Sequence, residues 1–530
     1  MKADFIIVGA GSAGCVLANR LSASGRCSVL LLEAGPVDRN PWVHVPLGYA
    51  KLFDNPKVNW GYRTEPEPEL GGRVIAQPRG KVLGGSSSIN GLVYVRGQAE
   101  DYDRWRQMGN PGWSYDDVLP LFRRSENQER GPDAWHGVGG PLSVSNARDT
   151  HPLADAFIEA CAAAGLPPND DFNGPRQEGA GYFQTTSRNG VRVSAAKAYL
   201  KPARKRANLH IMTDAQVTRV LFDGNRAIGV AYRRNGKDHE ATARVEVILS
   251  GGAINSPQLL ELSGIGDGER LRGLGIETRA HSPNVGENLQ DHFQARIVMR
   301  THTPITLNDT YRNPLRRIGM GLDYLIRRRG YLAVSAGLAS AFFRTRPELA
   351  SPDIQVHLVP FSSDRMGAAL HDYSGFTASV CQLRPESRGH VHAVSPDPFI
   401  APEIRANYLS TEEDRRTVVA GLHQLRRYIA ADPLRALWRD ETIPGAAVAD
   451  DAALLAYARQ FGSTIYHPAC TCAMGPGEDA VLTPRLRVRG VEGLRVVDGS
   501  IMPTLVSGNT NGPIVMIGEK GAEMILEDAG

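Results

Sequence analysis

The chain has 530 residues, of which 42% are hydrophobic and 22% charged, a composition typical of a globular protein and a length that favours two domains. Its formal net charge of +3 is too close to neutrality to indicate a nucleic-acid partner. Six widely spaced cysteines do not make a disulfide framework, and no stretch approaches the ~20 apolar residues that a membrane-spanning helix needs.

The first predicted element is a buried parallel strand over residues 5–8, because Phe5-Ile6-Ile7-Val8 is short, apolar and largely β-branched. This strand leads into a glycine-rich turn, and we expect a helix over residues 12–22. Gly9 would permit the tight turn, Gly11 would let the backbone approach a pyrophosphate, and Gly14 would let the helix pack on the sheet. The N-terminus of that helix would then face the phosphates.

A second strand is expected over residues 28–32, and it ends at Glu33. A carboxylate about 20 residues after such glycines accepts hydrogen bonds from ribose hydroxyls. A structural turn is the alternative for the glycines alone, but strand, turn, helix, second strand and acid together predict a dinucleotide site. Nothing after Glu33 resembles a second, nicotinamide-binding half of alternating strands and helices.

Two further segments would complete the cofactor crevice. Residues 78–91 are dense in glycine and small hydroxyl residues, so their backbone amides can lie against a flat ring or phosphates. Leu83 and Ile89 alternate with these small residues, which argues against a plain surface loop. A third strand over residues 245–250 enters another glycine turn, followed by a helix.

The middle of the chain predicts a second sheet. Residues 353–358 and 389–394 alternate in period two, and Gln355 and His357 would share one face, lining a pocket or facing solvent. Residues 412–430 have the spacing of a core-facing amphipathic helix. Two stretches are candidates for mobile loops or lids: residues 131–140 and 301–314.

His467 is the candidate base. It lies between Tyr466 and Pro468, in a stretch without helical period, as expected of a rigid loop that presents one side chain. Oxidation of an alcohol requires removal of the hydroxyl proton, and imidazole is the side chain with a pKa closest to neutral. With 14 histidines in the chain, a structural histidine is the ordinary alternative.

Asn511 is the candidate polar partner of His467. Pro513 is expected to be the first residue of a C-terminal helix, with Asn511 or Gly512 as its cap. The N-terminus of that helix would stabilise the negative charge that develops on a cofactor ring when the ring is reduced. Asn511 would either act only as a cap or hydrogen-bond the substrate oxygen, and the second role is our expectation.

Several of these motifs, taken together, resemble the signature segments of the glucose-methanol-choline (GMC) oxidoreductase family, and most of all its bacterial choline-dehydrogenase-like alcohol dehydrogenases. The resemblance spans the whole chain. It is carried by these segments: residues 80–97, 252–266, 285–292, 385–389, 466–468 and 497–503.

The resemblance implies an α/β (α+β) fold with a Rossmann-like FAD-binding domain built from discontinuous segments and a sheet-and-helix substrate domain. We expect the FAD-binding domain in residues 1–150, 196–292 and 460–530, and the substrate-binding domain in residues 151–195 and 293–459.

The resemblance also implies FAD as the cofactor, His467 as the base and flavin N5 as the hydride acceptor. No metal is expected, because Cys470-Thr471-Cys472 lacks a second cluster to complete a site. The residues expected to hold the cofactor are Gly9, Gly11, Ser12, Ala13, Gly14, Glu33, Ala34, Arg79, Gly80, Leu83, Gly84, Gly85, Ser86, Asn90, Gly91, Val93, Val217, Gly252, Asp498, Gly499, Asn509, Thr510 and Pro513.

Two departures from the family pattern refine the expectation. Members that attach FAD covalently carry a histidine immediately before the asparagine of the glycine-rich segment, and Ile89 stands there in this chain, so the flavin should be non-covalent. Choline-type members carry a glutamate at the position that corresponds to Leu338. A leucine cannot balance a quaternary ammonium, which favours a neutral or apolar alcohol over choline. Among neutral alcohols we expect a primary one.

The expected activity is therefore oxidation of an alcohol to an aldehyde, with electrons passed to a quinone or other acceptor. Two alternatives stay open: an oxidase that uses oxygen, and a non-redox, FAD-containing hydroxynitrile lyase-like enzyme. We expect a cytoplasmic protein, since the apolar N-terminal stretch contains the glycine turn and no cleavage motif separates the two. Peripheral contact with the inner membrane and the oligomeric state stay open.

Overall fold

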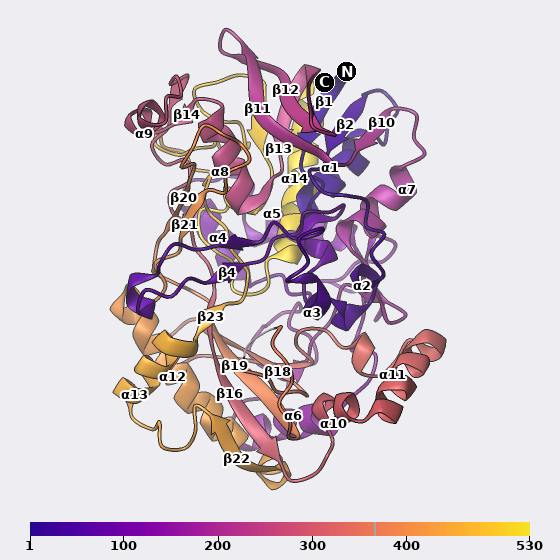
Figure 1. The fold of residues 1–530 in the computed structure, drawn as a ribbon, viewed down its shortest axis with the longest axis vertical. Helices are drawn as coiled ribbons and strands as arrows, with labels where there is room; N and C mark the ends of the chain where they lie inside the picture. Colours follow the sequence, from indigo (N-terminus) through magenta and orange to yellow (C-terminus); the bar gives the residue numbers. More distant parts are fainter. Residues whose placement is uncertain (365–366, 530) are drawn as a thin grey trace.

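Two seven-stranded sheets organise the chain in the computed structural model, which describes residues 1–364 and 367–529. Figure 1 shows them one above the other along the long axis, with the N- and C-termini both at the upper end. The mixed α/β prediction is confirmed.

The first sheet has the order β10-β2-β1-β13-β12-β11, and β24 pairs with β13. Its central strands run parallel, whereas β11 and β12 are antiparallel. The strands predicted near residues 5, 28 and 245 are therefore neighbours in this sheet. Its strands are β1 (Lys2–Val8), β2 (Val29–Leu32), β10 (Leu209–Met212), β11 (Ala215–Asp223), β12 (Arg226–Arg234), β13 (Lys237–Leu249) and β24 (Leu494–Val496).

Helices from opposite ends of the chain pack together against this sheet. α1 (Ser12–Leu21) and α14 (Asn511–Ala529) lie side by side. Their backbones approach closely at Gly518, where an added Cβ would lie 3.1 Å from the Ala13 Cα. The first and last helices of the chain therefore meet beside the glycine turn that follows β1.

The second sheet is antiparallel, with the order β22-β16-β19-β18-β17-β7, and β23 pairs with β16. α6 (Pro152–Ala163), α12 (Glu412–Ile429) and α13 (Asp451–Phe461) pack against it. Its strands are β7 (Gly179–Tyr182), β16 (Phe293–Thr301), β17 (Ala339–Phe343), β18 (Ile354–Val359), β19 (Gly375–Gln382), β22 (Trp438–Ile443) and β23 (Ser463–Thr464).

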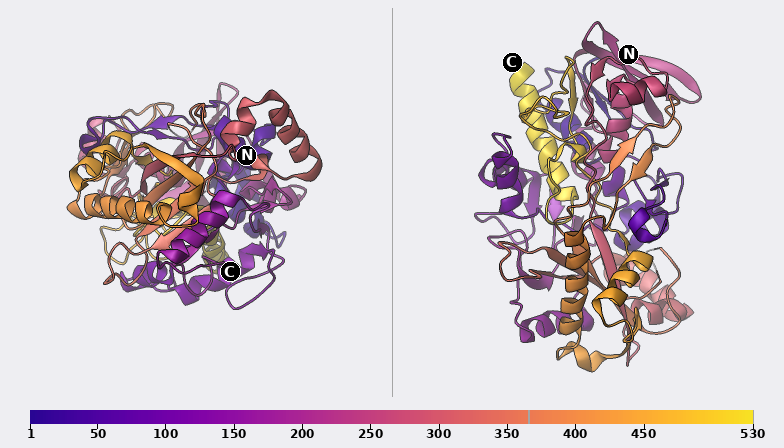
Figure 2. Two further views of the ribbon diagram at one scale, coloured as in Figure 1. Left: turned by 90° about the horizontal axis from the view of Figure 1, so that it is seen from below. Right: turned by 90° about the vertical axis from the view of Figure 1, so that its left-hand side faces the viewer.

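The remaining elements connect and cover these sheets. They include α2 (Pro41–His44), α3 (Tyr49–Leu52), a 3₁₀ helix over Gly85–Ser88, α4 (Ala99–Gln107), α5 (Tyr115–Ser125), α7 (Lys201–Ala203), α8 (Gly252–Leu262), α9 (Gly268–Gly273), α10 (Leu307–Arg312), α11 (Pro314–Arg327), β20 (His390–His392) and β21 (Glu403–Arg405). Figure 2 shows α14 along one side of the molecule and α11 standing away from its body.

Most sequence predictions agree with these elements, within one residue for the strand at residues 28–32 and the helix at residues 412–430, whereas β1 begins three residues before the predicted strand. The expectation of a loop at residues 301–314 is wrong in part, because α10 forms within it under a Thr306–Asp309 capping box. The strand predicted at residues 389–394 forms as β20, but it pairs with β21 outside the main sheet.

The strands of the first sheet come from the segments expected for the FAD-binding domain, and those of the second sheet come from the segments expected for the substrate-binding domain. β23 is the exception, because its segment was expected in the FAD-binding domain but it joins the second sheet. The domain boundaries stay a prediction, and residues 365, 366 and 530 within them lie outside the described residues.

Candidate active site

A crevice opens at the carboxyl ends of β1, β2 and β13, where a parallel sheet ordinarily binds its ligands. Gly9 turns the chain at a φ of 100°, and α1 then begins at Ser12 without a side-chain cap, so its first amides face the crevice. A Cβ at Gly14 would lie 1.9 Å from the Gly9 carbonyl oxygen. Gly14 therefore lets α1 pack closely against the turn that follows β1.

Glu33 ends β2 at the edge of this crevice. Its two carboxylate oxygens accept hydrogen bonds from the Ala10 and Gly35 amides at 2.8 and 2.9 Å. Burial raises the pKa of Glu33 to about 7, an effect that the two amides oppose. A carboxylate held in this way can accept further hydrogen bonds, such as those of ribose hydroxyls.

The predicted glycine-rich segment closes the crevice from the other side. The Gly84 amide donates to the Ala10 carbonyl at 2.8 Å, and an added Cβ at Gly85 would lie 2.7 Å from the Gly11 Cα. Arg79 donates from Nη2 to the Tyr466 carbonyl at 2.6 Å, while its buried Nε has no protein partner among the described residues.

These features test whether an adenine dinucleotide fits the chain. Glycines leave the turn free of side chains, and helix N-termini supply backbone amides. The unpaired Nε of Arg79 and the buried carboxylate of Glu33 face the same space. The empty space measures about 1160 Å³, open solvent included. The donor set and the space fit FAD.

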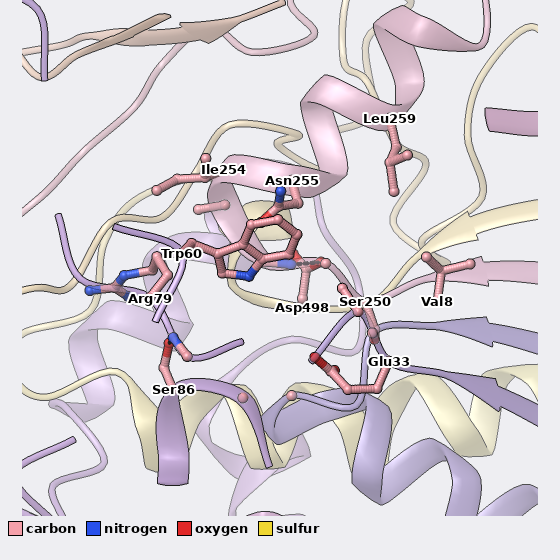
Figure 3. Close-up of a pocket in the computed structure, with 18 of the residues that line it drawn as sticks. Val8, Glu33, Trp60, Arg79, Ser86, Ser250, Ile254, Asn255, Leu259 and Asp498 are labelled. Carbon is pink, nitrogen blue, oxygen red and sulfur yellow. Dashed lines mark hydrogen bonds between the residues drawn. The ribbon is translucent and has the colours of Figure 1, made fainter. Parts of the chain in front are cut away.

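Trp60 and Asn255 also line the crevice (Figure 3). Asn255 follows the glycine turn that was expected to border the crevice, whereas Trp60 lies in a segment for which no element was predicted. The Trp60 ring stacks on Tyr62 with centroids 5.6 Å apart, and the Lys81 ammonium lies 4.4 Å from its centroid. Asp498 reaches the crevice too, but its carboxylate already accepts from Gly252 N at 2.8 Å, which ties α8 to the end of β24.

A second, inner cavity adjoins the crevice. Ser12, Arg79, Ser86, Thr510 and Ile514 line both spaces. The inner cavity encloses about 1220 Å³, open solvent included, and no aspartate or glutamate is among its described lining residues.

One face of the second sheet forms a wall of the inner cavity. Residues of β16, β18 and β19 alternate, so apolar side chains face α12 while polar ones face the cavity. Arg296, Ser379 and His357 are cross-strand neighbours in the cavity wall. The same alternation in the Gly375–Gln382 stretch was the signal that could have identified Thr377 and Ser379.

His467 presents its imidazole to the inner cavity. The loop that carries it leaves β23 through Tyr466, whose φ of 71° is rare for a bulky residue and occurs at functional sites. The His467 amide donates to Asp291 Oδ1 at 2.8 Å. The side chain is 8% exposed, so little solvent reaches it.

A hydrogen-bonded relay orients His467. His292 donates from Nε2 to the Leu383 carbonyl at 3.0 Å, and the Nδ1 atoms of His292 and His467 lie 3.0 Å apart. Burial lowers the pKa of His292 to about 4, so its Nδ1 is an acceptor at neutral pH. His467 Nδ1 must then donate, which leaves the lone pair on Nε2.

His467 itself stays neutral. Burial lowers its pKa well below the usual imidazole range, and the neighbouring His292, His357 and Arg79 lower it further. A neutral imidazole with its lone pair on Nε2 can accept a proton from a hydroxyl in the cavity.

Asn509 and Asn511 both line the inner cavity with His467, and Asn509 is the one in contact with its imidazole. Asn509 Nδ2 lies 3.2 Å from His467 Nε2, and Asn509 Oδ1 accepts from Gln355 Nε2 at 3.0 Å. Asn511 instead accepts from the Ser12 hydroxyl at 2.8 Å. The prediction placed the start of α14 at Pro513, but the helix begins at Asn511. The substrate contact expected of Asn511 stays a prediction.

His357 faces the cavity, which settles the alternative left open by the sequence. Neither ring nitrogen has a hydrogen-bond partner among the described residues, and burial lowers the pKa of His357 to about 3. A buried polar group without a partner is costly, so His357 is suited to a ligand that offers a hydrogen bond.

The remaining predicted residues divide between the two spaces. Those that line the crevice are Gly9, Gly11, Ser12, Ala13, Glu33, Ala34, Arg79, Gly80, Gly85, Ser86, Val217, Gly252, Asp498, Gly499 and Thr510. Those that line the inner cavity include Asn90, Gly91 and Val93. Four others support the walls from behind: Gly14, Leu83, Gly84 and Pro513.

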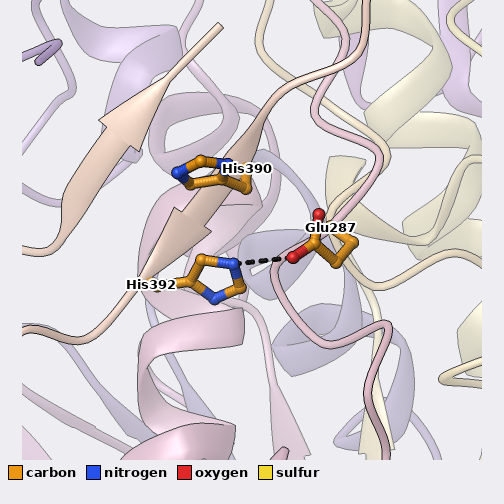
Figure 4. Close-up of side chains that lie close together, drawn as sticks. All are labelled: Glu287, His390 and His392. Carbon is orange, nitrogen blue, oxygen red and sulfur yellow. Dashed lines mark hydrogen bonds and ion pairs between the residues drawn. The ribbon is translucent and has the colours of Figure 1, made fainter. Parts of the chain in front are cut away.

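All six cysteines are unpaired, and Cys470 and Cys472 are buried. Glu287, His390 and His392 form a separate group whose ligating atoms lie within 4.8 Å of one another (Figure 4). His392 already contacts Glu261 at 2.8 Å and Glu287 at 2.9 Å. These pairs tie β20 to α8 and to the loop before β16.

Replacing Gly14 with valine should abolish cofactor retention, because the new side chain would collide with the Gly9 carbonyl and displace α1 from the turn. We expect the purified variant to lose at least about tenfold in bound flavin per chain, measured by absorbance after denaturation. Gly273→Ala is the matched control, since an added Cβ there meets nothing within 4 Å. Wild-type flavin content in Gly14→Val would contradict this account of the turn.

Comparison with known proteins agrees with this architecture. Residues 3–294 and 385–518 match the N-terminal and C-terminal models of GMC oxidoreductases. The chain is 45% identical to human mitochondrial choline dehydrogenase, over 98% of this chain and 89% of that protein. It is 42% identical to the alcohol dehydrogenase [acceptor] of Pseudomonas putida, over 99% and 95%.

Solved structures show the same fold. Pyridoxine 4-oxidase from Mesorbium loti superposes with a TM-score of 0.89 at 31% identity, covering 98% of each chain. An FAD-dependent oxidoreductase from Chaetomium thermophilum gives a TM-score of 0.91 at 26% identity, covering 99% of each chain. The chain belongs to the GMC oxidoreductase family.

Proposed function

We propose that this protein binds FAD non-covalently in the crevice and oxidises a neutral primary alcohol to the aldehyde in the inner cavity. The observation that carries the proposal is the placement of the His467 Nε2 lone pair in the inner cavity that adjoins the crevice. Bound FAD supplies a two-electron acceptor for the hydride that leaves the alcohol carbon. The electrons would pass on to a quinone or another acceptor.

The chain's own residues perform the proton chemistry. The substrate hydroxyl would lie between His467 Nε2 and Asn509 Nδ2, which are 3.2 Å apart without substrate and would separate to admit the oxygen. His467 takes the hydroxyl proton, while the Asn509 amide donates to the oxygen as negative charge develops there. The His292 contact keeps the accepting nitrogen of His467 unprotonated before each turnover.

Non-covalent attachment is supported by Ile89, which stands at the position where covalent members of the family carry histidine. Its side chain packs with Val43, Leu52, Val58 and Val82 and offers no nucleophile.

The charge of the cavity supports a substrate without a cation. Arg79 and Arg296 line it, and no described lining residue is acidic. Leu338, which stands where choline-type relatives carry glutamate, is buried against the second sheet. A quaternary ammonium would enter a positive space without a counter-ion, which desolvation makes costly.

Single substitutions of Asn509 and Asn511 should therefore have different effects on turnover. Asn509→Ala removes the donor to the substrate oxygen and should lower kcat/KM for an alcohol by about 10²-fold, as loss of one oxyanion donor does. Asn511→Ala keeps that donor and should lower kcat/KM less than about tenfold, its effect falling on flavin content through Ser12. The measurement is steady-state turnover with a dye acceptor, normalised to bound flavin. Equal loss in both variants would argue against the assignment.

Choline and its uncharged isostere 3,3-dimethyl-1-butanol test the charge argument directly. The two alcohols have nearly the same shape, so a difference in kcat/KM reports the cost of the cation. We expect the isostere to be favoured by at least about tenfold, the effect of one poorly compensated charge. A preference for choline would show that an acidic group outside the described lining balances it, and would refute a neutral substrate.

A further inference from the structure

α11 (Pro314–Arg327) exposes an apolar stripe on the surface of the molecule. Its large apolar residues Leu315, Ile318, Leu322, Leu325 and Ile326 are between 53% and 80% exposed. They recur at spacings of three and four residues, which places them on one side of the helix. An apolar stripe of this kind ordinarily packs against the protein core.

The opposite side of α11 attaches the helix to the body. Tyr324 is its only buried residue, and the Tyr324 hydroxyl donates to the Gly190 carbonyl at 3.0 Å. The apolar stripe therefore faces away from the protein, and Arg316, Arg317 and Arg327 on the rest of the helix surface are exposed as well. Figures 1 and 2 show α10 and α11 projecting from the lower part of the molecule.

Arginines surround the apolar stripe. Residues 307–329 contain six arginines and two aspartates, and Asp309 already pairs with Arg312 at 2.8 Å. The net positive charge indicates an anionic partner surface. A second copy of the helix would bring two arginine-rich faces together, which like-charge repulsion disfavours. An exposed apolar stripe flanked by arginines is typical of helices that lie in the interface of a bilayer.

No helix of the described residues is long and apolar enough to cross a bilayer. We propose that α11 docks the protein on a membrane containing anionic lipids, with its apolar stripe between the acyl chains and its arginines on lipid phosphates.

Docking would bring the inner cavity close to the membrane. The Leu307 amide donates to the Pro360 carbonyl at 3.0 Å, and Asn308 bonds to Ser362 at 3.0 Å. The intervening Phe361 lines the inner cavity. If the proposed function is correct, a bilayer-dissolved alcohol or quinone would thereby reach the cavity without crossing bulk water.

Flotation of the flavin-loaded protein with vesicles tests the docking independently of activity. Phosphatidylcholine vesicles are compared with vesicles that contain about 30% phosphatidylglycerol, at low and high salt. Two variants remove the stripe or its charge: Leu315→Ser/Ile318→Ser/Leu322→Ser/Ile326→Ser and Arg316→Gln/Arg317→Gln. The control replaces two apolar residues of similar exposure elsewhere: Val138→Ser/Val394→Ser.

We expect the wild type and the control to float with anionic vesicles and to bind at least about tenfold less to zwitterionic ones. Both α11 variants should lose binding by a similar factor, yet retain wild-type flavin content and turnover with a soluble dye. Absence of wild-type binding, or equal binding by the serine variant, would overturn the proposal. So would a wild-type dimer that the serine substitutions dissociate without any vesicle binding, since the stripe would then be a subunit contact.

Discussion

The contact between the Nδ1 atoms of His292 and His467, 3.0 Å apart, is the interaction on which the candidate site depends. It assigns the proton of His467 to Nδ1 and so directs the lone pair of Nε2 into the cavity. The relay works because burial keeps His292 neutral and the Leu383 carbonyl accepts its one ring N–H proton. Without this direction, a buried imidazole could present either nitrogen to the substrate.

The second sheet brings His292 and His467 together. β23 pairs with β16, and the Ile465 amide donates to the His292 carbonyl at 3.0 Å, which brings the loop of His467 beside the second sheet. The first sheet supplies the glycine turn, and α14 carries the last segment of the chain back to it. The candidate base therefore lies where a cofactor crevice and a polar sheet face share a boundary, although its partner His292 is 175 residues away in the chain.

The local part of this arrangement was predictable. Gly9, Gly14 and Glu33 follow a short-range pattern in which each residue type has one steric or hydrogen-bonding reason, and the structure places them accordingly. His467 stood out because of its motif. The contact of Asn509 with His467 did not stand out, because it depends on how the segment before α14 packs against the loop of His467.

Other features depend on tertiary packing and left no trace in the sequence. Trp60 reaches the crevice from a segment without a regular pattern, and Arg296 gains its place only through pairing of β16 with β19. The apolar residues of α11 show helical spacing, yet spacing alone predicts a buried stripe. Only the structure shows that this stripe faces outward.

Anaerobic mixing of the flavin-loaded protein with a panel of alcohols, followed by absorbance, tests whether His467 acts as the base in alcohol oxidation. The account predicts that a neutral primary alcohol bleaches the wild-type flavin, whereas His467→Ala, with flavin still bound, is bleached at least about 10²-fold more slowly. Slow return of colour in air would support an acceptor other than oxygen. Failure of every alcohol to bleach the wild type, or bleaching of His467→Ala at the wild-type rate, would contradict the account.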